Sequence, residues 1–466
     1  MSVLRPLGDT GLQCHPLGFG CYRIDDDQPA HAEALAAYLE RGGNLIDTSA
    51  NYLDGGSELL VGRVLRDCSR DRVIVVTKGG YIQGSNLKLA RERDFPEVVR
   101  YADGLWHSIH PDFLETQVRL SAERLQVGYV DVYLLHNPEY YLTHIAHRHP
   151  PAAADHEEFY RRIREAFRFL EDQVQQGRIR WYGVSSNNYP LPAGDPVATS
   201  IERTLAAAES VSDRHHFRVV QLPLNLFESG GALEPNNDGG TPLDFCRRQG
   251  IGVLANRPLN AYFHDRLIRL ADFLPPGADP PGEDELRALL APLADHEKRL
   301  ADLGFGSEGP TVAGTLMEIA PRLVSAAHWE QSAMPQLLRS IRAWLGLSSQ
   351  DRAGRPEWES WQEQFVPLVT GAFQGLHRHL SARQQPVSDQ ARVELAQAGY
   401  PPSGESLSRL ALNLLLGLEG LSCVLVGMRR PEYVEDAMGA TGLERVDGRE
   451  ILKRFREGLE CQPDEH

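Results

Sequence analysis

The sequence lacks a C-x-x-C pair, an apolar run long enough to cross a bilayer, and an excess of basic residues. Its six cysteines are scattered, which argues against a disulfide framework and against a cysteine zinc site. No apolar stretch reaches the roughly 18 residues that a membrane helix needs. The first residues lack the apolar region of a secretory signal, and the last ones carry no lipidation motif. We therefore expect a cytoplasmic protein without a membrane segment.

Basic residues are fewer than acidic ones. The chain has 48 Lys and Arg against 64 Asp and Glu, a formal net charge of −16 at pH 7. Nucleic-acid binding needs a basic surface that neutralises phosphates, so this balance argues against a nucleic-acid partner. His377 and His379 lie two residues apart in a helical pattern and would point to different faces, so we expect no metal site.

The sequence does contain short runs of Val, Ile and Leu that alternate with amphipathic helical patterns. Buried strands are expected at 17–20, 44–47, 73–77, 130–135, 180–184, 218–222, 251–254 and 422–426. Helices are expected at 30–41, 57–67, 111–126, 156–176, 197–209, 241–249 and 406–418. This alternation predicts an α/β fold, a closed TIM (β/α)8 barrel rather than an open doubly wound sheet.

A second region interrupts the alternation between about 264 and 404, where no strand signal occurs. One face of its helical pattern gathers Phe365, Leu368, Val369, Phe373, Leu376 and Leu380. We therefore predict strands 1 to 7 of the barrel in 1–263, a helical insertion after strand 7 in 264–404, and strand 8 with C-terminal helices in 405–466. Barrel active sites lie at the C-terminal ends of strands, so the insertion is expected to act as a lid. A peripheral stability or dimerisation module is the alternative.

Four polar residues stand at or just after predicted strand ends: Asp47, Tyr52, Lys78 and His136. Strand ends of a closed barrel converge on one pocket. Reduction of a carbonyl needs a proton donor for its oxygen, and a phenol needs help to serve as one. Lys78 would lower the pKa of Tyr52, Asp47 would hold the lysine, and His136 would donate a hydrogen bond to the substrate oxygen. Taken singly, each could be an ordinary capping, surface or buried residue; together they fit one mechanism.

Several motifs resemble the aldo-keto reductase family in their order along the chain. They are LRPLGDTGLQCHPLGFGCY at 4–22, GGNLIDTSANYLDGGSELLVGRVL at 42–65, VIVVTKGG at 73–80, VDVYLLHNPE at 130–139, GRIRWYGVSSNNY at 177–189 and VLVGMRRPEYVEDAM at 424–438. The resemblance covers roughly 1–260 and 405–440. It implies an N-terminal β-hairpin before the barrel and the catalytic tetrad Asp47, Tyr52, Lys78 and His136.

The same resemblance implies a nicotinamide cofactor. Ser185 and Gln221 would bond its carboxamide, with Ser186 and Asn187 as alternatives because the family's usual Ser-Asn pair is displaced here. The remaining implied contacts are Arg257, Pro258, Leu259, Gly427, Met428, Arg429, Arg430 and Asp436. Two arginines before a predicted helix at Pro431 suit a 2′-phosphate, which favours NADP(H) over NAD(H).

The predicted activity is hydride transfer between NADP(H) and a small carbonyl or alcohol, with Tyr52 as the general acid or base. The alternative is a nicotinamide-binding regulatory or redox-sensing subunit with the same fold. The long loop between Lys78 and His136, with Tyr81, Phe95, Tyr101 and Trp106, is expected to shape the substrate pocket. The alternative is that these aromatic residues anchor the loop to the barrel. The substrate, the reaction direction and the choice between monomer and homodimer stay open.

Overall fold

The computed structural model describes residues 4–263, 266–274, 278–303, 311–323, 325–352 and 354–460. The described chain divides into two units, 1–270 with 394–466 and 271–393. Those residues of the predicted insertion that fall between these ranges, and Cys461 with the residues after it, lie outside the described part of the chain.

Eight parallel strands close a barrel in the first unit, each pairing with the next along the chain and the last with the first. The strands are β3 (Leu17–Gly20), β4 (Leu45–Asp47), β5 (Ile74–Gly79), β9 (Val130–His136), β10 (Ile179–Ser185), β11 (Phe217–Pro223), β12 (Gly252–Asn256) and β15 (Cys423–Val426). The predicted barrel is confirmed, and each predicted strand coincides with one of these to within two residues at either end.

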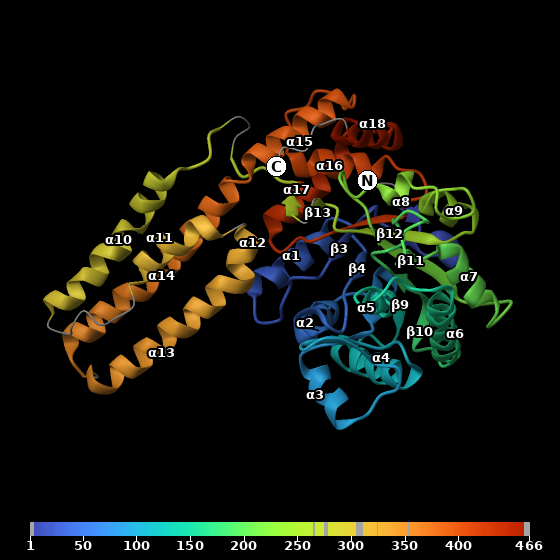
Figure 1. Cartoon of the computed structure of the whole chain (residues 1–466), viewed down its shortest axis with the longest axis horizontal. Helices are drawn as coiled ribbons and strands as arrows, with labels where there is room; N and C mark the ends of the chain where they lie inside the picture. Colours follow the sequence, from blue (N-terminus) through green and yellow to red (C-terminus); the bar gives the residue numbers. More distant parts are fainter. Residues whose placement is uncertain are drawn as a thin grey trace. The chain divides into compact units, whose positions relative to one another are not determined.

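Helices surround this barrel (Figure 1). The predicted ones are observed as α1 (Pro29–Glu40), α2 (Gly56–Leu65), α4 (Pro111–Leu125), α6 (Ala153–Gln175), α7 (Ile201–Glu209), α9 (Pro242–Arg248) and α16 (Leu407–Leu416). Further helices are α3 (Ser85–Glu92), α5 (Tyr140–Ala146), α8 (Gly230–Leu233), α17 (Pro431–Gly439) and α18 (Gly448–Glu460). Several of these helices begin after a residue whose side chain caps the first turn. At α16, the Ser406 hydroxyl accepts a hydrogen bond from the Arg409 N–H, which satisfies a donor that the helix leaves free.

The barrel interior is apolar at the N-terminal ends of its strands. A short hairpin of β1 (Arg5–Pro6) and β2 (Gln13–Cys14) lies before the barrel, as predicted, and Leu7 and Cys14 pack with the barrel residues Leu45, Val132 and Leu254. With this end filled by side chains, the polar residues of the interior are left for the opposite ends of the strands.

Two predictions about the connecting segments are wrong. The segment after Lys78 was expected as a loop, but it contains a three-stranded sheet of β6 (Tyr81–Ile82), β8 (Leu105–His107) and β7 (Val99–Ala102). The region from 264 was expected to hold no strand, but β14 (Arg266–Arg269) pairs with β13 (Asn260–Phe263). Strands of two to four residues are shorter than the window in which periodicity can be recognised.

The second unit is helical in its described residues. It contains α10 (Glu283–Asp302), α11 (Val312–Ile319), α12 (Ala326–His328), α13 (Met334–Arg352), α14 (Pro356–Ala382) and the start of α15 (Gln385–Gln397). Within it α10, α11 and α14 lie beside one another (Figure 1). The apolar face predicted on α14 is buried at Phe365, Val369 and Phe373, and the rings of Trp358 and Trp361 stack with centroids 5.4 Å apart.

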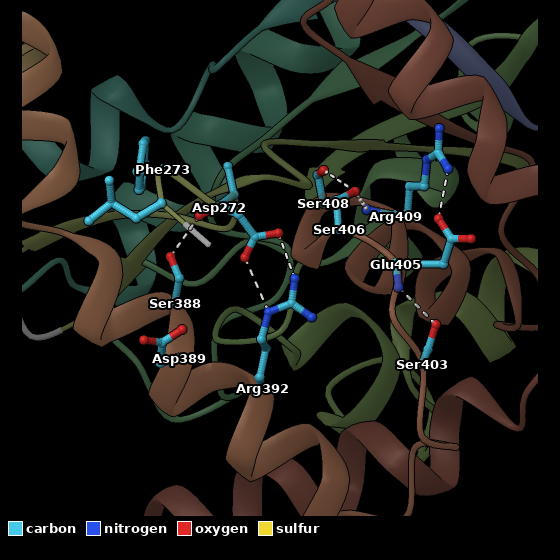
Figure 2. Close-up of polar contacts among 12 residues, drawn as sticks. Asp272, Phe273, Ser388, Asp389, Arg392, Ser403, Glu405, Ser406, Ser408 and Arg409 are labelled. Carbon is cyan, nitrogen blue, oxygen red and sulfur yellow. Dashed lines mark hydrogen bonds and ion pairs between the residues drawn. The ribbon is translucent and has the colours of Figure 1, made fainter. Parts of the chain in front are cut away.

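Polar contacts tie the start of this helical unit to α15 (Figure 2). Arg392 forms a bidentate pair with Asp272, with distances of 3.1 and 2.6 Å. The Ser388 hydroxyl donates to the Ala271 carbonyl at 2.7 Å, and the Phe273 N–H donates to Gln385 Oε1 at 2.8 Å. The chain therefore enters and leaves the unit at one place.

None of the described helices combines the length and the apolar character that crossing a membrane requires.

Candidate active site

Three of the four predicted catalytic residues are joined by direct hydrogen bonds. Lys78 Nζ, on β5, lies 2.7 Å from Asp47 Oδ2 at the end of β4 and 3.1 Å from the Tyr52 hydroxyl in the turn that follows. Lys78 Nζ also donates to the Thr48 carbonyl at 2.9 Å. The lysine side chain is fully buried, so all its polar contacts are with the protein. The arrangement holds an ammonium against a phenol.

The electrostatics of this group differ in one respect from the sequence-based expectation. Burial alone would lower the pKa of Lys78, but Asp47 and Tyr52 outweigh it, and the net pKa is raised. Burial raises the pKa of Asp47 against the opposing effect of Lys78. Burial also raises the pKa of Tyr52 to about 12, although Lys78 acts to lower it. Lys78 acts in the expected direction, because it lowers the pKa of the phenol, but desolvation of the phenolate is the larger effect and the net pKa is raised.

His136, at the end of β9, completes the predicted group. Its ring lies across that of Tyr52, with centroids 5.8 Å apart, and against that of Tyr81 at 4.6 Å. Its Nδ1 is 2.9 Å from the Ser49 hydroxyl oxygen. Burial, followed by the charge of Lys78, holds the pKa of His136 well below its usual range, so the ring is neutral near pH 7.

The other half of the barrel places neutral polar groups beside this centre. Strand register sets Ser185 on β10 level with Gln221 on β11, and the Ser185 hydroxyl donates to Gln221 Oε1 at 3.1 Å. Gln221 Nε2 donates to Asp47 Oδ1 at 2.8 Å. Asn256 Nδ2, at the end of β12, reaches the same Gln221 Oε1 at 3.3 Å. The structure thus brings Ser185 and Gln221 together, as expected, and connects them to Asp47.

The loop after Ser185 is held by the carboxylate of Glu139, a residue that the sequence analysis did not single out. Glu139 Oε1 accepts a hydrogen bond from the Asn187 backbone N–H at 2.7 Å. Its second oxygen, Oε2, is buried without a hydrogen-bond partner in the described part of the chain. Burial raises the pKa of Glu139 to about 7. Ser186 bonds to Thr199 at 3.0 Å, so its hydroxyl is engaged within the loop.

The predicted cofactor-binding residues after β12 are Arg257, Pro258 and Leu259, and their surroundings differ. Arg257 forms an ion pair with Glu228 at 2.6 Å and lies over the ring of Tyr262. Pro258 is buried and Leu259 half-buried. Because Glu228 neutralises Arg257, this arginine contributes little free positive charge. Asn256 Oδ1 and Arg257 Nε are buried and have no hydrogen-bond partner among the described residues.

The predicted phosphate-binding segment follows β15. Gly427 and Arg430 are exposed, Arg429 is half-buried, and Met428 is buried. Neither arginine forms an ion pair within the described ranges, and both precede the first turn of α17. Two unneutralised guanidinium groups beside a helix N-terminus suit an anion.

Asp436 differs from the rest of the predicted set. Its carboxylate accepts hydrogen bonds from Ser406 at 2.8 Å and from Ser408, and it pairs with Arg409 at 3.1 Å. Figure 2 shows the neighbouring pair of Arg409 and Glu405, which are 2.7 Å apart. Asp436 thus fastens α17 to the start of α16.

Sequence reasoning missed Ser49, Glu139 and Asn256. Ser49 lies between Asp47 and Tyr52 in the motif DTSANY, and Glu139 lies three residues after His136. Both are close in sequence to residues that were identified, which is the signal that could have indicated them. Asn256 is the last residue of the seventh strand, and Gln221 lies two residues before the end of the sixth.

The model of the aldo/keto reductase family matches residues 16–266. A methylglyoxal reductase of Escherichia coli, named as NADH-specific, is 27% identical over 192 residues, which are 39% of this chain and 51% of that protein. An NADP(+) aryl-alcohol dehydrogenase of Phanerodontia chrysosporium is 27% identical over 196 residues, 40% of this chain and 42% of that protein. The chain spans about half the length of the curated relatives it matches.

Among solved structures, the glycerol dehydrogenase of Gluconobacter oxydans superposes with a TM-score of 0.51 at 16% identity, over 99% of this chain and 98% of that one. A similarity at this identity concerns the fold. The family model covers more than half of the chain, and its span includes the ends of seven of the eight barrel strands. On this evidence the chain belongs to the aldo/keto reductase family.

Proposed function

We propose that this chain is an NADP(H)-dependent oxidoreductase that transfers hydride between nicotinamide and a small carbonyl or alcohol substrate. Tyr52 acts as the general acid in reduction and as the general base in oxidation. The observation that carries the proposal is the buried Lys78 ammonium, which lies within hydrogen-bond distance of both the Tyr52 hydroxyl and Asp47. Such an arrangement serves a proton transfer that creates a phenolate.

The path of the transferred proton follows from these contacts. As hydride reaches the carbonyl carbon, the carbonyl oxygen becomes negative and takes the proton of the Tyr52 hydroxyl. With a pKa of about 12, Tyr52 is protonated at neutral pH and ready to donate. The phenolate that remains lies 3.1 Å from Lys78 Nζ, and Asp47 keeps that lysine charged. In alcohol oxidation the same groups act in reverse, and the phenolate accepts the hydroxyl proton.

The residues of the second half fit a nicotinamide cofactor, which supplies or accepts the hydride when bound. A carboxamide offers both donors and acceptors. The complementary atoms belong to Ser185, Gln221 and Asn256, whose Oδ1 has no hydrogen-bond partner within the described part of the chain. Arg429 and Arg430 would receive the 2′-phosphate, which supports NADP(H) over NAD(H). The further contacts proposed are Ser186, Asn187, Arg257, Pro258, Leu259, Gly427, Met428 and Asp436.

An aromatic wall borders the place where a substrate would meet Tyr52. The ring of Tyr22 stands across that of Tyr52 with centroids 5.2 Å apart, and Tyr81 contacts both His136 and Tyr140. These rings give a small carbonyl or alcohol an apolar surface beside polar tips. The cytoplasmic location and the choice between monomer and homodimer stay predictions from the sequence.

A single-turnover experiment tests the proposal. Bound NADPH is mixed with a panel of aldehydes and ketones, and its oxidation is followed for the wild type, for Tyr52→Phe and for the control Tyr129→Phe. Loss of the proton donor is expected to slow oxidation by roughly 100-fold or more, whereas NADPH binding and the control stay near wild type. Equal rates for Tyr52→Phe and wild type would contradict the proposal. Tight NADPH binding without turnover of any substrate would instead favour the regulatory subunit.

A further inference from the structure

The turn that carries Tyr52 has a backbone that ordinary residues rarely adopt. It spans Tyr52–Gly55 and leads into α2, and we call it the tyrosine turn. Leu53 (φ 48°, ψ 43°) and Asp54 (φ 54°, ψ 36°) are both left-handed. This conformation brings the Cβ of an L-residue too close to the following carbonyl oxygen, so both residues are strained. Contacts with other segments must therefore hold the turn in this form.

Asp54 supplies such a contact, whereas Leu53 does not. The side chain of Leu53 is 47% exposed, so little apolar burial fixes the turn there. The carboxylate of Asp54 also lies at the surface, but both its oxygens accept from the Ser85 N–H, at 3.0 and 3.1 Å, and Oδ1 accepts from the Ser85 hydroxyl at 2.8 Å. Ser85 is the first residue of α3, so this negative charge lies at a helix N-terminus, where it is favoured.

The residues before Ser85 are shaped to meet the tyrosine turn. Gly84 is left-handed, with φ 53°, and a Cβ at this position would lie 2.5 Å from Asp54 Oδ1. A residue without a side chain is therefore needed for the close approach. One residue earlier, the side-chain amides of Gln83 and Asn51 are in contact at 3.1 Å. The segment 83–85 thus contacts both the turn and the residue that precedes it.

This contact links the aromatic wall to the proton donor. Tyr81 on β6 belongs to the wall, and Ser85 follows four residues later. On the other side of the contact, Tyr52 lies two residues before Asp54, and its hydroxyl is 3.1 Å from Lys78 Nζ. A hydrogen bond of this length is lost when one partner moves by about 1 Å. The form of the turn therefore decides whether the phenol stays beside the ammonium.

We propose that Asp54 is a positioning residue for Tyr52. By binding the N-terminus of α3, it holds the tyrosine turn in its strained form and keeps the phenol beside Lys78. The segment between β5 and α4 thereby acts on proton donation as well as on the wall of the pocket. The inference rests on the proposed function in one respect, since Tyr52 is taken to be the general acid.

The position of the Tyr52 ring is measured first, in a way that needs no turnover. Protein labelled with 3-fluorotyrosine is examined by ¹⁹F NMR, and Tyr52→Phe serves only to assign the signal. Asp54→Ala should shift the Tyr52 signal. Asp54→Asn keeps an acceptor oxygen and tolerates a left-handed backbone, so its signal should stay near the wild-type position. A loss of stability alone would not move the Tyr52 signal of the folded protein.

Two further variants make this measurement decisive. Ser85→Ala removes only the hydroxyl contact and should shift the signal by less, and its effect should not add to that of Asp54→Ala. The matched control is Asp155→Ala, which removes a carboxylate that accepts from the Ala152 N–H at 2.8 Å at the start of α6. An unchanged signal in every folded variant that lacks part of the Asp54 contact, or an equal shift in the control, would overturn the inference.

The rate of proton-coupled hydride transfer is measured second. Single-turnover oxidation of NADPH is followed with the aldehyde or ketone that the wild type reduces fastest. Asp54→Ala is expected to slow it by roughly tenfold, because a misplacement of about 1 Å is costly to catalysis. Asp54→Asn should restore most of the rate, and NADPH affinity should stay near wild type. A loss of affinity with an unchanged rate would overturn the positioning role. If the wild type reduced no carbonyl, the proposed function would fail, while the fluorine spectra would still decide the inference.

Discussion

The two halves of the barrel rim differ in the kind of polar group that they present. The ends of β4, β5 and β9 carry a carboxylate, an ammonium and an imidazole. Burial raises the pKa of Asp47 and lowers that of His136, whereas the pKa of Lys78 is raised against burial by Asp47 and Tyr52. The ends of β10, β11 and β12 carry a hydroxyl and two amides, which hold no charge. Proton transfer needs groups whose pKa values are set by their surroundings, whereas recognition of a carboxamide needs neutral donors and acceptors. Under the proposed function, one rim would separate these two tasks.

The halves are joined at two places. Gln221 donates to Asp47 at 2.8 Å, and Glu139, just after β9, receives the Asn187 N–H, just after β10, at 2.7 Å. These contacts give each half a direct effect on the other. Variants on either side of them can test whether the division of tasks is real.

Replacement of Lys78 should have the largest effect and should fall on the chemical step. In Lys78→Met the phenolate formed at Tyr52 loses its neighbouring cation, and single-turnover hydride transfer is expected to slow by roughly 10²- to 10⁴-fold. NADPH affinity, measured by fluorescence titration, should change far less. The exposed Lys88→Met is the control. A large loss of NADPH affinity with an unchanged rate would erase the distinction between the two halves.

The contact between Glu139 and the Asn187 N–H, which joins the two halves, can be tested by measuring the free energy of unfolding. Its pKa is about 7 in the folded protein against an ordinary 4.5, because burial penalises the carboxylate. A raised folded-state pKa means that protonated Glu139 favours the fold fully below the ordinary value, and this contribution is lost as pH rises through about 7. The shift corresponds to roughly 3 kcal/mol at 1.36 kcal/mol per unit.

Urea unfolding of the wild type and of Glu139→Gln at pH 4.5, 6 and 8 measures this contribution. The wild type is expected to lose roughly 3 kcal/mol more than the variant across the range, because glutamine does not titrate. Parallel pH profiles for the two proteins would show that Glu139 is not a protonated contact in the fold.

Arg429 and Arg430 test cofactor selection, which belongs to the second half of the rim. Removing a charged hydrogen-bond partner of a 2′-phosphate costs roughly 10- to 100-fold in affinity. Arg430→Ala and Arg429→Ala should each weaken NADPH by an amount within this range and leave NADH nearly unchanged, by isothermal titration. The exposed Arg41→Ala is the control. An equal loss for both cofactors would remove the support for NADP(H) specificity.

Gln221 should give the smallest effect, because its contacts are hydrogen bonds between a neutral amide and its neighbours. Gln221→Leu is expected to weaken nicotinamide cofactors by up to roughly tenfold. It also removes a donor from Asp47, so a modest fall in the single-turnover rate should accompany the loss of affinity. A change in rate without any change in affinity would assign Gln221 to the proton-transfer half.

Much of the fold was predictable because its signals are local. Buried parallel strands form continuous apolar runs, and each of the eight was visible as such, as were the helices between them. The proximity of Asp47, Tyr52, Lys78 and His136 was predictable because strand ends of a barrel converge. The sheet of β6, β7 and β8 and the pair of β13 and β14 were missed, since their strands are too short to leave a period. Whether the helical unit is a lid or a peripheral module stays a prediction.

The sequence by itself determined the barrel, the family and the residue types at the strand ends, since each depends on patterns within a few neighbouring positions. Only the tertiary structure decided how those groups interact. The burial that raises the pKa of Tyr52 despite Lys78, the contact of Glu139 with the Asn187 N–H, and the contact of Ser49 with His136 all depend on distances between segments far apart in the chain. Desolvation and hydrogen-bond pairing are properties of surroundings, and a linear pattern does not contain them.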